Sequence, residues 1–96
     1  MTTSDLRLLS LEEINDSLAR LSEWNLEDNG KSIVKNLKFD NFKEAMEFLN
    51  KVAEIAEAEG HHPDAFLHSF NRLQIKMTTH SAHGLTEKDF DVASKI

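Results

Sequence analysis

The sequence lacks cysteine and tyrosine, has one proline and three glycines, and carries fewer basic than acidic side chains. Without cysteine, disulfides, zinc-thiolate sites and thiol catalysis are excluded. The 11 basic and 17 acidic side chains give a formal charge of −6, which disfavours nucleic acid and anionic membranes as partners. No stretch approaches the roughly 18 apolar residues of a membrane span. The start, Met1 to Arg7, is charged where a signal peptide is apolar, so a cytoplasmic protein is predicted.

The length of 96 residues and the hydrophobic content of 40% predict a single domain over residues 1–96. So small a domain buries only about two thirds of the surface of its unfolded chain. Apolar surface that docks a second copy would supplement this burial. A homodimer or a homotetramer is therefore expected.

The N-terminal part predicts a helix followed by a hairpin. Ser10 and Glu13 have the spacing of a capping box. A helix over residues 11–21 follows from four apolar residues at helical spacing: Leu11, Ile14, Leu18 and Leu21. Asn29-Gly30 predicts a two-residue type I′ turn, whose central positions both need positive φ. The returning strand alternates Ile33, Leu37 and Phe39 with polar residues.

The middle of the chain predicts a long helix that starts after Asn41 and ends at Gly60. Asn41 and Glu44 have capping-box spacing, Gly60 suits a left-handed helix end, and Pro63 prevents continuation. The helix has an apolar stripe made of Phe42, Ala45, Met46, Leu49, Val52, Ala53 and Ala56.

Two extended runs and a short helix complete the pattern. The runs cover 66–70 and 73–80, with a tight turn at Asn71-Arg72, and the alternation directs His80 away from the aliphatic face. Thr86 and Asp89 form another capping box, flanked by Leu85 and Phe90 as a hydrophobic staple. The predicted order is αββαββα. This order indicates an α+β fold, a four-stranded antiparallel sheet with helices packed on one face.

The histidines are clustered. All five lie within the 23 residues from His61 to His83. Histidine is the side chain whose ordinary pKa of about 6.5 lets it give and take protons near neutral pH. The cluster therefore favours acid-base chemistry.

Local sequence adds detail around the first pair of histidines. Pro63 restricts the backbone of His62, which fixes the direction of that side chain. If the preceding helix keeps its period for one more turn, Glu57 and His61 are i, i+4 neighbours, and the carboxylate can orient the imidazole.

Plainer interpretations stand beside this one. The His61-His62 pair is also compatible with a solvated loop, His80 with an exposed strand residue, and Asp89 with a cap alone. Packing is the default role for His68, which lies between Phe66 and Phe70. Trp24 suits the core, although a flat ligand could stack on it. A metal site is a further alternative, built from Glu57, His61, His80 and His83.

A set of residues at fixed spacing carries a resemblance to a known family. Glu57-x-x-x-His61-His62-Pro63, then Phe70, His80 and Asp89, resembles the signature of the pterin-4a-carbinolamine dehydratases. Further similarity lies in Asn71-Arg72, Thr78-Thr79-His80 and Gly84-Leu85-Thr86, and the family fold agrees with the predicted element order.

The resemblance implies a dehydration without a metal or organic cofactor. The substrate is then a 4a-hydroxytetrahydropterin released by aromatic amino acid hydroxylases, and the products are quinonoid dihydropterin and water. Loss of hydroxide from C4a needs a proton donor, and loss of the N5 proton needs a base. General acid-base help of this kind contributes about 10²–10⁴-fold.

By the same resemblance, His61 and His80 form the acid-base pair, His62 binds substrate and assists, and Glu57 orients His61. Which histidine donates stays open. The remaining implied substrate contacts are Phe70, Thr79 and Asp89.

The sequence departs from the family pattern at two places. Gly60 replaces an acidic residue that many relatives have, and Ala65-Phe66 stands where some have tryptophan. Two other functions stay open: an oligomerising protein-binding module of the transcription-cofactor type, and a dehydratase for a different pterin.

Overall fold

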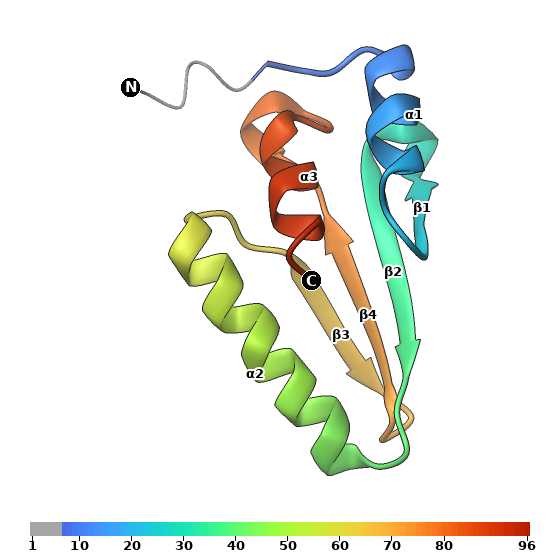
Figure 1. Ribbon diagram of the computed structural model, residues 1–96, viewed down its shortest axis with the longest axis vertical. Coiled ribbons are helices and arrows are strands. Elements are labelled where there is room, and N and C mark those ends of the chain that lie inside the picture. Colours follow the sequence, from blue (N-terminus) through green and yellow to red (C-terminus); the bar gives the residue numbers. More distant parts are fainter. Residues whose placement is uncertain (1–6) are drawn as a thin grey trace.

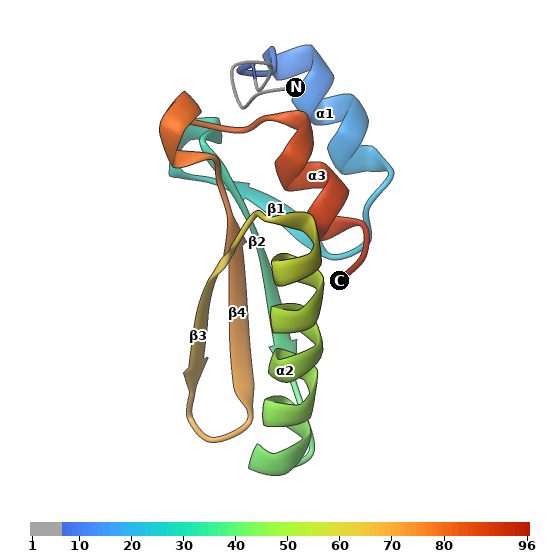
Figure 2. The ribbon, with the colours of Figure 1, turned by 90° about the vertical axis from the view of Figure 1, so that its left-hand side faces the viewer.

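A computed structural model describes residues 7–96 and shows three helices packed on one side of a four-stranded sheet (Figures 1 and 2). The order is α1 (Leu11–Ala19), β1 (Trp24–Glu27), η2 (Asp28–Gly30), β2 (Ser32–Lys38), α2 (Phe42–Glu59), β3 (Asp64–His68), β4 (Arg72–Met77), η3 (His80–Ala82) and α3 (Glu87–Ala93). The sheet has the order β1-β2-β4-β3, with every neighbouring pair antiparallel. The predicted α+β fold and the order αββαββα are confirmed. The prediction that residues 1–7 are not a signal peptide lies outside the described residues, except at Arg7.

The helix ends largely follow the predicted capping. Ser10 and Glu13 form the reciprocal capping box of α1, which ends at Ala19 rather than at residue 21. Asn41 accepts from the Glu44 N–H, but Glu44 accepts from Asp40 N–H, so only half of the predicted box forms. Within residues 7–96, no helix is both long and apolar enough to cross a membrane.

The β1–β2 hairpin forms, but its predicted two-residue turn is wrong. The last pair is Glu27 with Ser32, which leaves a loop of residues 28–31. Asn29 and Gly30 have positive φ as predicted, and Asp28 also has a φ of 55°. The Asp28 carboxylate accepts from the Ser32 hydroxyl at 2.6 Å, which stabilises the wider loop.

The β3–β4 turn lies earlier than predicted. His68 pairs with Arg72, so the loop is residues 69–71 and not Asn71-Arg72. Ser69 and Phe70 adopt left-handed backbone with φ of 50° and 54°. The Asn71 side chain instead donates to the Phe39 carbonyl at 2.9 Å, and this bond fastens the turn to the segment before α2.

The core lies between the sheet and the helices. In β4 the alternation predicted from the sequence is observed: Leu73, Ile75 and Met77 are buried beneath the helices. Not all residues of the predicted helical stripes are buried. Leu11 is 63% exposed and Phe42 is 53% exposed, and each is the first residue of its helix. Ala53 of α2 is exposed as well.

Candidate functional site

The end of α2 determines where His61 lies. Gly60 adopts the left-handed conformation with φ 66°, and the His61 N–H then donates to the Ala56 carbonyl at 3.2 Å. This six-to-one bond is the Schellman arrangement, which satisfies the last carbonyls of a helix and turns the chain away from its axis. His61 therefore leaves α2 toward α3 instead of continuing the helix.

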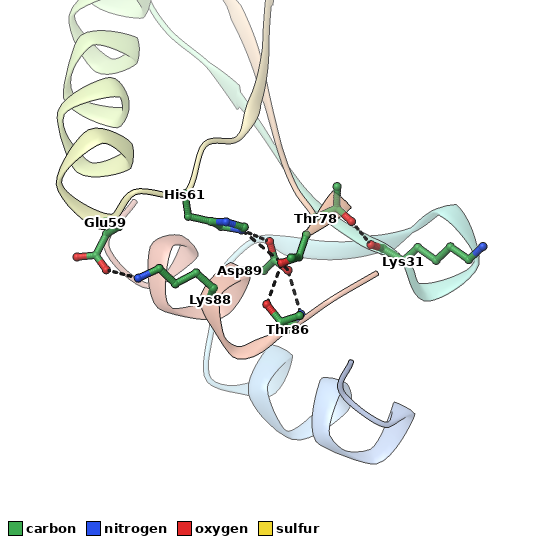
Figure 3. Close-up of polar contacts among 8 residues, drawn as sticks. Lys31, Glu59, His61, Thr78, Thr86, Lys88 and Asp89 are labelled. Carbon is green, nitrogen blue, oxygen red and sulfur yellow. Dashed lines mark hydrogen bonds and ion pairs between the residues drawn. The ribbon is translucent and has the colours of Figure 1, made fainter. Parts of the chain in front are cut away.

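The His61 ring meets a buried carboxylate at the start of α3. Its Nε2 atom lies 2.7 Å from Oδ1 of Asp89, whose side chain is fully buried while that of His61 is 13% exposed. The second carboxylate oxygen of Asp89 accepts from the Thr79 hydroxyl at 2.7 Å and from the Thr86 N–H at 3.0 Å. Figure 3 shows His61 pointing toward this group from the end of α2. Asp89 thus caps α3 and also holds the imidazole.

The hydrogen positions in this network follow from the bonding capacity of each group. A carboxylate only accepts, so Nε2 of His61 carries the hydrogen that it gives to Asp89. Thr79 has one hydroxyl hydrogen, which goes to Asp89, so the 2.8 Å contact between Thr86 and Thr79 is a bond donated by Thr86. In a neutral His61 ring, Nδ1 is then the atom with a free lone pair, and it has no partner among residues 7–96.

Ion pairs also join the two helices beside this network. Glu59, two residues before His61, lies 3.6 Å from the Lys88 ammonium and 2.5 Å from that of Lys95 (Figure 3 shows the first pair). The Lys95 ammonium is the main cause of a Glu59 pKa below its ordinary value. Lys88 belongs to α3 and Lys95 follows it, so Glu59 also holds the C-terminal end of α2 against α3.

Glu57 does not contact His61, and the predicted i, i+4 pair is wrong. Its Oε2 atom lies 2.5 Å from Nε2 of His62, and both side chains are largely exposed. The cause is the left-handed Gly60, which ends the helical period before His61. His62 and Glu57 line a cavity of about 190 Å³ between α2 and β3, and neither His61 nor His80 lines it. Adjacent histidines therefore face different elements.

His80 lies next to the network but outside it. It is exposed as predicted, but the predicted strand over residues 73–80 is too long: β4 ends at Met77, and His80 is the first residue of η3. The preceding Thr79 is buried, and its Oγ1 lies 3.5 Å from Nε2 of His61. His80 therefore directly follows a residue that contacts His61 and Asp89, and it makes no hydrogen bond with His61.

The three other predicted substrate contacts, Phe70, Thr79 and Asp89, lie in different places in the chain. Phe70 lies at the β3–β4 turn, whereas His62 and Pro63 precede β3, and a five-residue strand spans about 16 Å at ~3.3 Å per residue. Thr79 and Asp89 are buried and bonded to each other, so they position His61 instead of lining an open surface.

His68 and Trp24 are not members of the His61–Asp89 network. His68 does not pack in the core: it stacks on Phe66, which is 60% exposed, on the uncovered face of the sheet. The alternation places Leu67, not His68, toward the helices. Trp24 is buried in the core, and the Lys35 ammonium lies 5.9 Å from its ring centre.

The alternative metal site is not assembled. Within residues 7–96, no group of three or more histidine, aspartate or glutamate side chains is placed to hold a metal ion. Glu57 is paired with His62 and His61 with Asp89, which separates the ligands proposed for that site.

Comparison with known proteins connects this geometry to a family. The sequence model described as Pterin 4 alpha carbinolamine dehydratase matches residues 7–96. The chain belongs to the pterin-4a-carbinolamine dehydratase family. Two relatives provisionally named as pterin-4-alpha-carbinolamine dehydratases are from Trichodesmium erythraeum, with 47% identity over 93% of this chain and 92% of the relative, and Nostoc sp., with 48% identity over 94% of each. Most of the chain thus aligns with members of the pterin-4a-carbinolamine dehydratase family.

Solved structures of related proteins have the same fold. A protein from Brucella melitensis, described as a transcriptional coactivator/pterin dehydratase, matches with a TM-score of 0.84 and 36% identity over 91% of this chain and 92% of that one. A pterin dehydratase-like protein, described as a RuBisCO assembly factor in the alpha-carboxysome, matches with a TM-score of 0.64 and 19% identity over 77% and 84%. The second match shows the pterin-4a-carbinolamine dehydratase fold alone.

The link that sequence reasoning missed is the one between His61 and Asp89. The two residues are 28 positions apart, and no local period relates them. Thr86 was predicted only as a cap, yet its hydroxyl also supports Thr79. The spacing of the family signature marks Asp89 as a candidate site residue, but it does not indicate which residue Asp89 contacts.

Proposed function

We propose that this protein dehydrates a 4a-hydroxytetrahydropterin to the quinonoid dihydropterin by histidine acid-base catalysis, with His61 as the base. The observation that carries the proposal is the 2.7 Å bond from His61 to the buried Asp89 carboxylate. Family membership supports the substrate class. The hydrogen bonds described above support the roles of individual residues.

The base role follows from the tautomer. With its Nε2 hydrogen given to Asp89, neutral His61 presents Nδ1 as the proton acceptor for N5 of the substrate. The ring becomes positive when it takes this proton, and the Asp89 carboxylate compensates that charge across a short, largely buried contact. The N5 electron pair then forms the new C=N bond with C4a as hydroxide leaves.

His80 supplies the proton that converts the departing hydroxide into water. It is exposed, so it exchanges protons with solvent and can return to its acidic form after each turnover. His62 is paired with Glu57 at the separate cavity between α2 and β3, and because its side chain is 61% exposed, its ring can turn from there toward His61 and bind the substrate. Overall one proton leaves N5, one reaches the leaving oxygen, and water is the only by-product.

The decisive measurement is the decay of freshly generated 4a-hydroxytetrahydropterin, followed by absorbance. Wild-type protein should accelerate this decay, and His61→Ala or His80→Ala should each lose at least about 10-fold, within the usual size of general acid-base effects. His83→Ala is the matched control, because His83 is an exposed histidine at the end of η3. Decay unaffected by folded wild-type protein would contradict the proposal.

No metal or organic cofactor takes part in the proposed step. Exhaustive chelation should therefore leave the rate unchanged. Loss of the rate on chelation and its recovery with zinc would show that a metal is needed.

We also propose that the protein acts in the cytoplasm, in tetrahydrobiopterin recycling, and that it is a homodimer or homotetramer of a single domain.

A second candidate is a protein-binding module without catalysis. The observation in its favour is the description of the Brucella melitensis protein as a transcriptional coactivator as well as a pterin dehydratase. The intact His61–Asp89 network favours the enzyme, because a scaffold has no need of an oriented imidazole. A dehydratase for a different pterin predicts the same variant effects, and rates with pterins of different side chains separate it from the first proposal.

A further inference from the structure

A row of basic side chains lies where β2 and β3 end and β4 begins. Figures 1 and 2 show that this end of the sheet is the one farthest from α3. Lys38 of β2 pairs directly with Arg72 of β4, and Arg72 pairs with His68 of β3. Directly opposed residues of antiparallel strands project from the same face. Their neighbours Leu37 and Leu73 face the helices, so the row of Lys38, Arg72 and His68 lies on the uncovered face.

The charges of this row are not neutralised within the described chain. Among residues 7–96, no carboxylate lies within 4.0 Å of the Lys38 ammonium or the Arg72 guanidinium. Lys76, on the same face of β4, is in contrast paired with Asp28 at 2.7 Å. Like charges directly opposite one another destabilise a sheet. In a chain of net charge −6, this unpaired row indicates a site for an anion.

Two cavities meet at these three residues. One of about 260 Å³ is bordered by Asn36, Leu37, Lys38, His68, Arg72 and Leu73. The other, of about 460 Å³, is bordered by Lys38, His68, Ser69, Phe70, Asn71 and Arg72. The shared residues are Lys38, His68 and Arg72, so two cationic side chains and an imidazole border space that a ligand can occupy.

The next row of the same face is suited to a flat ring. Phe66 is 60% exposed and stacks on His68 with ring centres 4.8 Å apart and planes inclined by 17°. Gln74, opposite Phe66, donates to the Asn36 amide oxygen at 3.2 Å. An exposed aromatic ring beside two amides offers stacking and hydrogen bonds to a heterocycle.

We propose that Lys38, Arg72 and His68 bind the phosphate of a small molecule of the nucleotide class, whose ring lies against Phe66. Neighbouring strands are about 4.8 Å apart, so the row spans about 10 Å and its long side chains can converge on one phosphate. Arginine binds phosphate through two parallel hydrogen bonds, and lysine adds a compact charge. The acidic surface elsewhere repels a long polyanion, which favours a mononucleotide over a nucleic-acid strand. This site is separated from His61 by the length of β3, so it does not depend on the dehydratase proposal.

Titration of ¹⁵N-labelled protein with adenosine monophosphate and with inorganic phosphate tests the site. Both probes should shift the amides of Lys38, His68 and Arg72 saturably, with adenosine monophosphate binding more tightly. Lys38→Gln and Arg72→Gln should each weaken both probes at least about tenfold, the size expected for losing a charge-assisted hydrogen bond. Lys51→Gln, an exposed charge loss on α2, should change neither.

If Lys38 and Arg72 served only to stabilise the fold, their glutamine variants would melt at a lower temperature than wild type. The binding proposal instead predicts that Lys38→Gln and Arg72→Gln melt no lower than wild type, because each removes a repulsion between opposed charges. Phe66→Ala should weaken the binding of adenosine monophosphate but leave the binding of inorganic phosphate unchanged. Unchanged binding of adenosine monophosphate by this variant would overturn the ring contact. Absence of saturable shifts in wild type, or equal binding by the glutamine variants, overturns the site. An oligoadenylate that shifts the same amides at lower concentration than the mononucleotide would assign the row to nucleic acid instead.

Discussion

Nε2 of His61 lies 2.7 Å from Oδ1 of Asp89, although 28 positions separate the two residues and they lie on different elements. His61 follows the end of α2, and Asp89 lies in the first turn of α3. The same carboxylate closes the capping box of α3. The orientation of His61, the proposed base, therefore depends on the position of α3, although neither His61 nor His80 belongs to that helix.

Asp89→Asn should lower the dehydration rate at least about 10-fold, as part of the 10²–10⁴-fold general acid-base effect. The amide keeps the size of the side chain but loses the charge, and its NH₂ group favours the His61 tautomer with hydrogen on Nδ1. The rate and its pH profile are measured together with the circular dichroism spectrum. Asp91→Asn, an exposed change on the same helix, is the control. An unchanged rate in folded Asp89→Asn would rule out the proposed base.

Thr79→Val should destabilise the fold by about 1–3 kcal/mol, because the buried Asp89 carboxylate loses a donor and nothing replaces it. Thr79→Ser keeps the hydroxyl and should restore most of the loss. Urea unfolding of both variants measures the difference. If the two variants prove equally stable, the hydroxyl does not support Asp89.

Gly60→Ala should cost roughly 1–2 kcal/mol, because the residue adopts left-handed backbone with φ 66°. The cost is backbone strain alone, since nothing lies within 4 Å of the added Cβ atom. Gly60→Asn should cost less, as asparagine tolerates this conformation. Gly60→Asp introduces an acidic side chain, and its rate shows whether a carboxylate at this position assists His61. Equal unfolding free energies for the alanine variant and wild type would contradict the strain.

The pKa of Glu13 is lowered from 4.5 to about 2, chiefly by hydrogen bonds from the Arg7 guanidinium and then from the Ser10 N–H. Because the folded-state value is the lower one, the stabilisation is present above pH 4.5 and is lost as the pH falls toward 2. Carboxyl chemical shifts measured by NMR give the titration directly. In thermal melts at pH 6, Glu13→Gln should have a lower melting temperature than wild type. The two melting temperatures should converge in strong acid, and salt should reduce their difference. A Glu13 titration near its ordinary value would contradict the pairing.

The sequence predicted several elements that local chemistry determines, although the Asn41–Glu44 box forms only by half. The Ser10–Glu13 and Thr86–Asp89 capping boxes and the Gly60 helix end were all found from spacing, and all are observed. The turns were misplaced because strand register decides loop length: Glu27 pairs with Ser32, and His68 with Arg72.

The site was only partly predictable for the same reason. Spacing identified His61 and Asp89 as candidates, but Glu57 was assigned to the wrong histidine. The helical period was extended past Gly60, whose backbone reverses the direction of the chain. Contacts between residues far apart in sequence, such as Asp89 with His61, follow from packing of α3 against α2 and have no local signature.

All four strands are complete at Met77, whereas Thr86 and Asp89 come later, at the start of α3. A growing polypeptide that has already finished its sheet on the ribosome still lacks the carboxylate that orients His61. On the proposed mechanism, the acid-base pair is therefore complete only after the residues of the sheet have been synthesised. Loss of α3 by proteolysis would then abolish the proposed chemistry while every strand stayed in the chain.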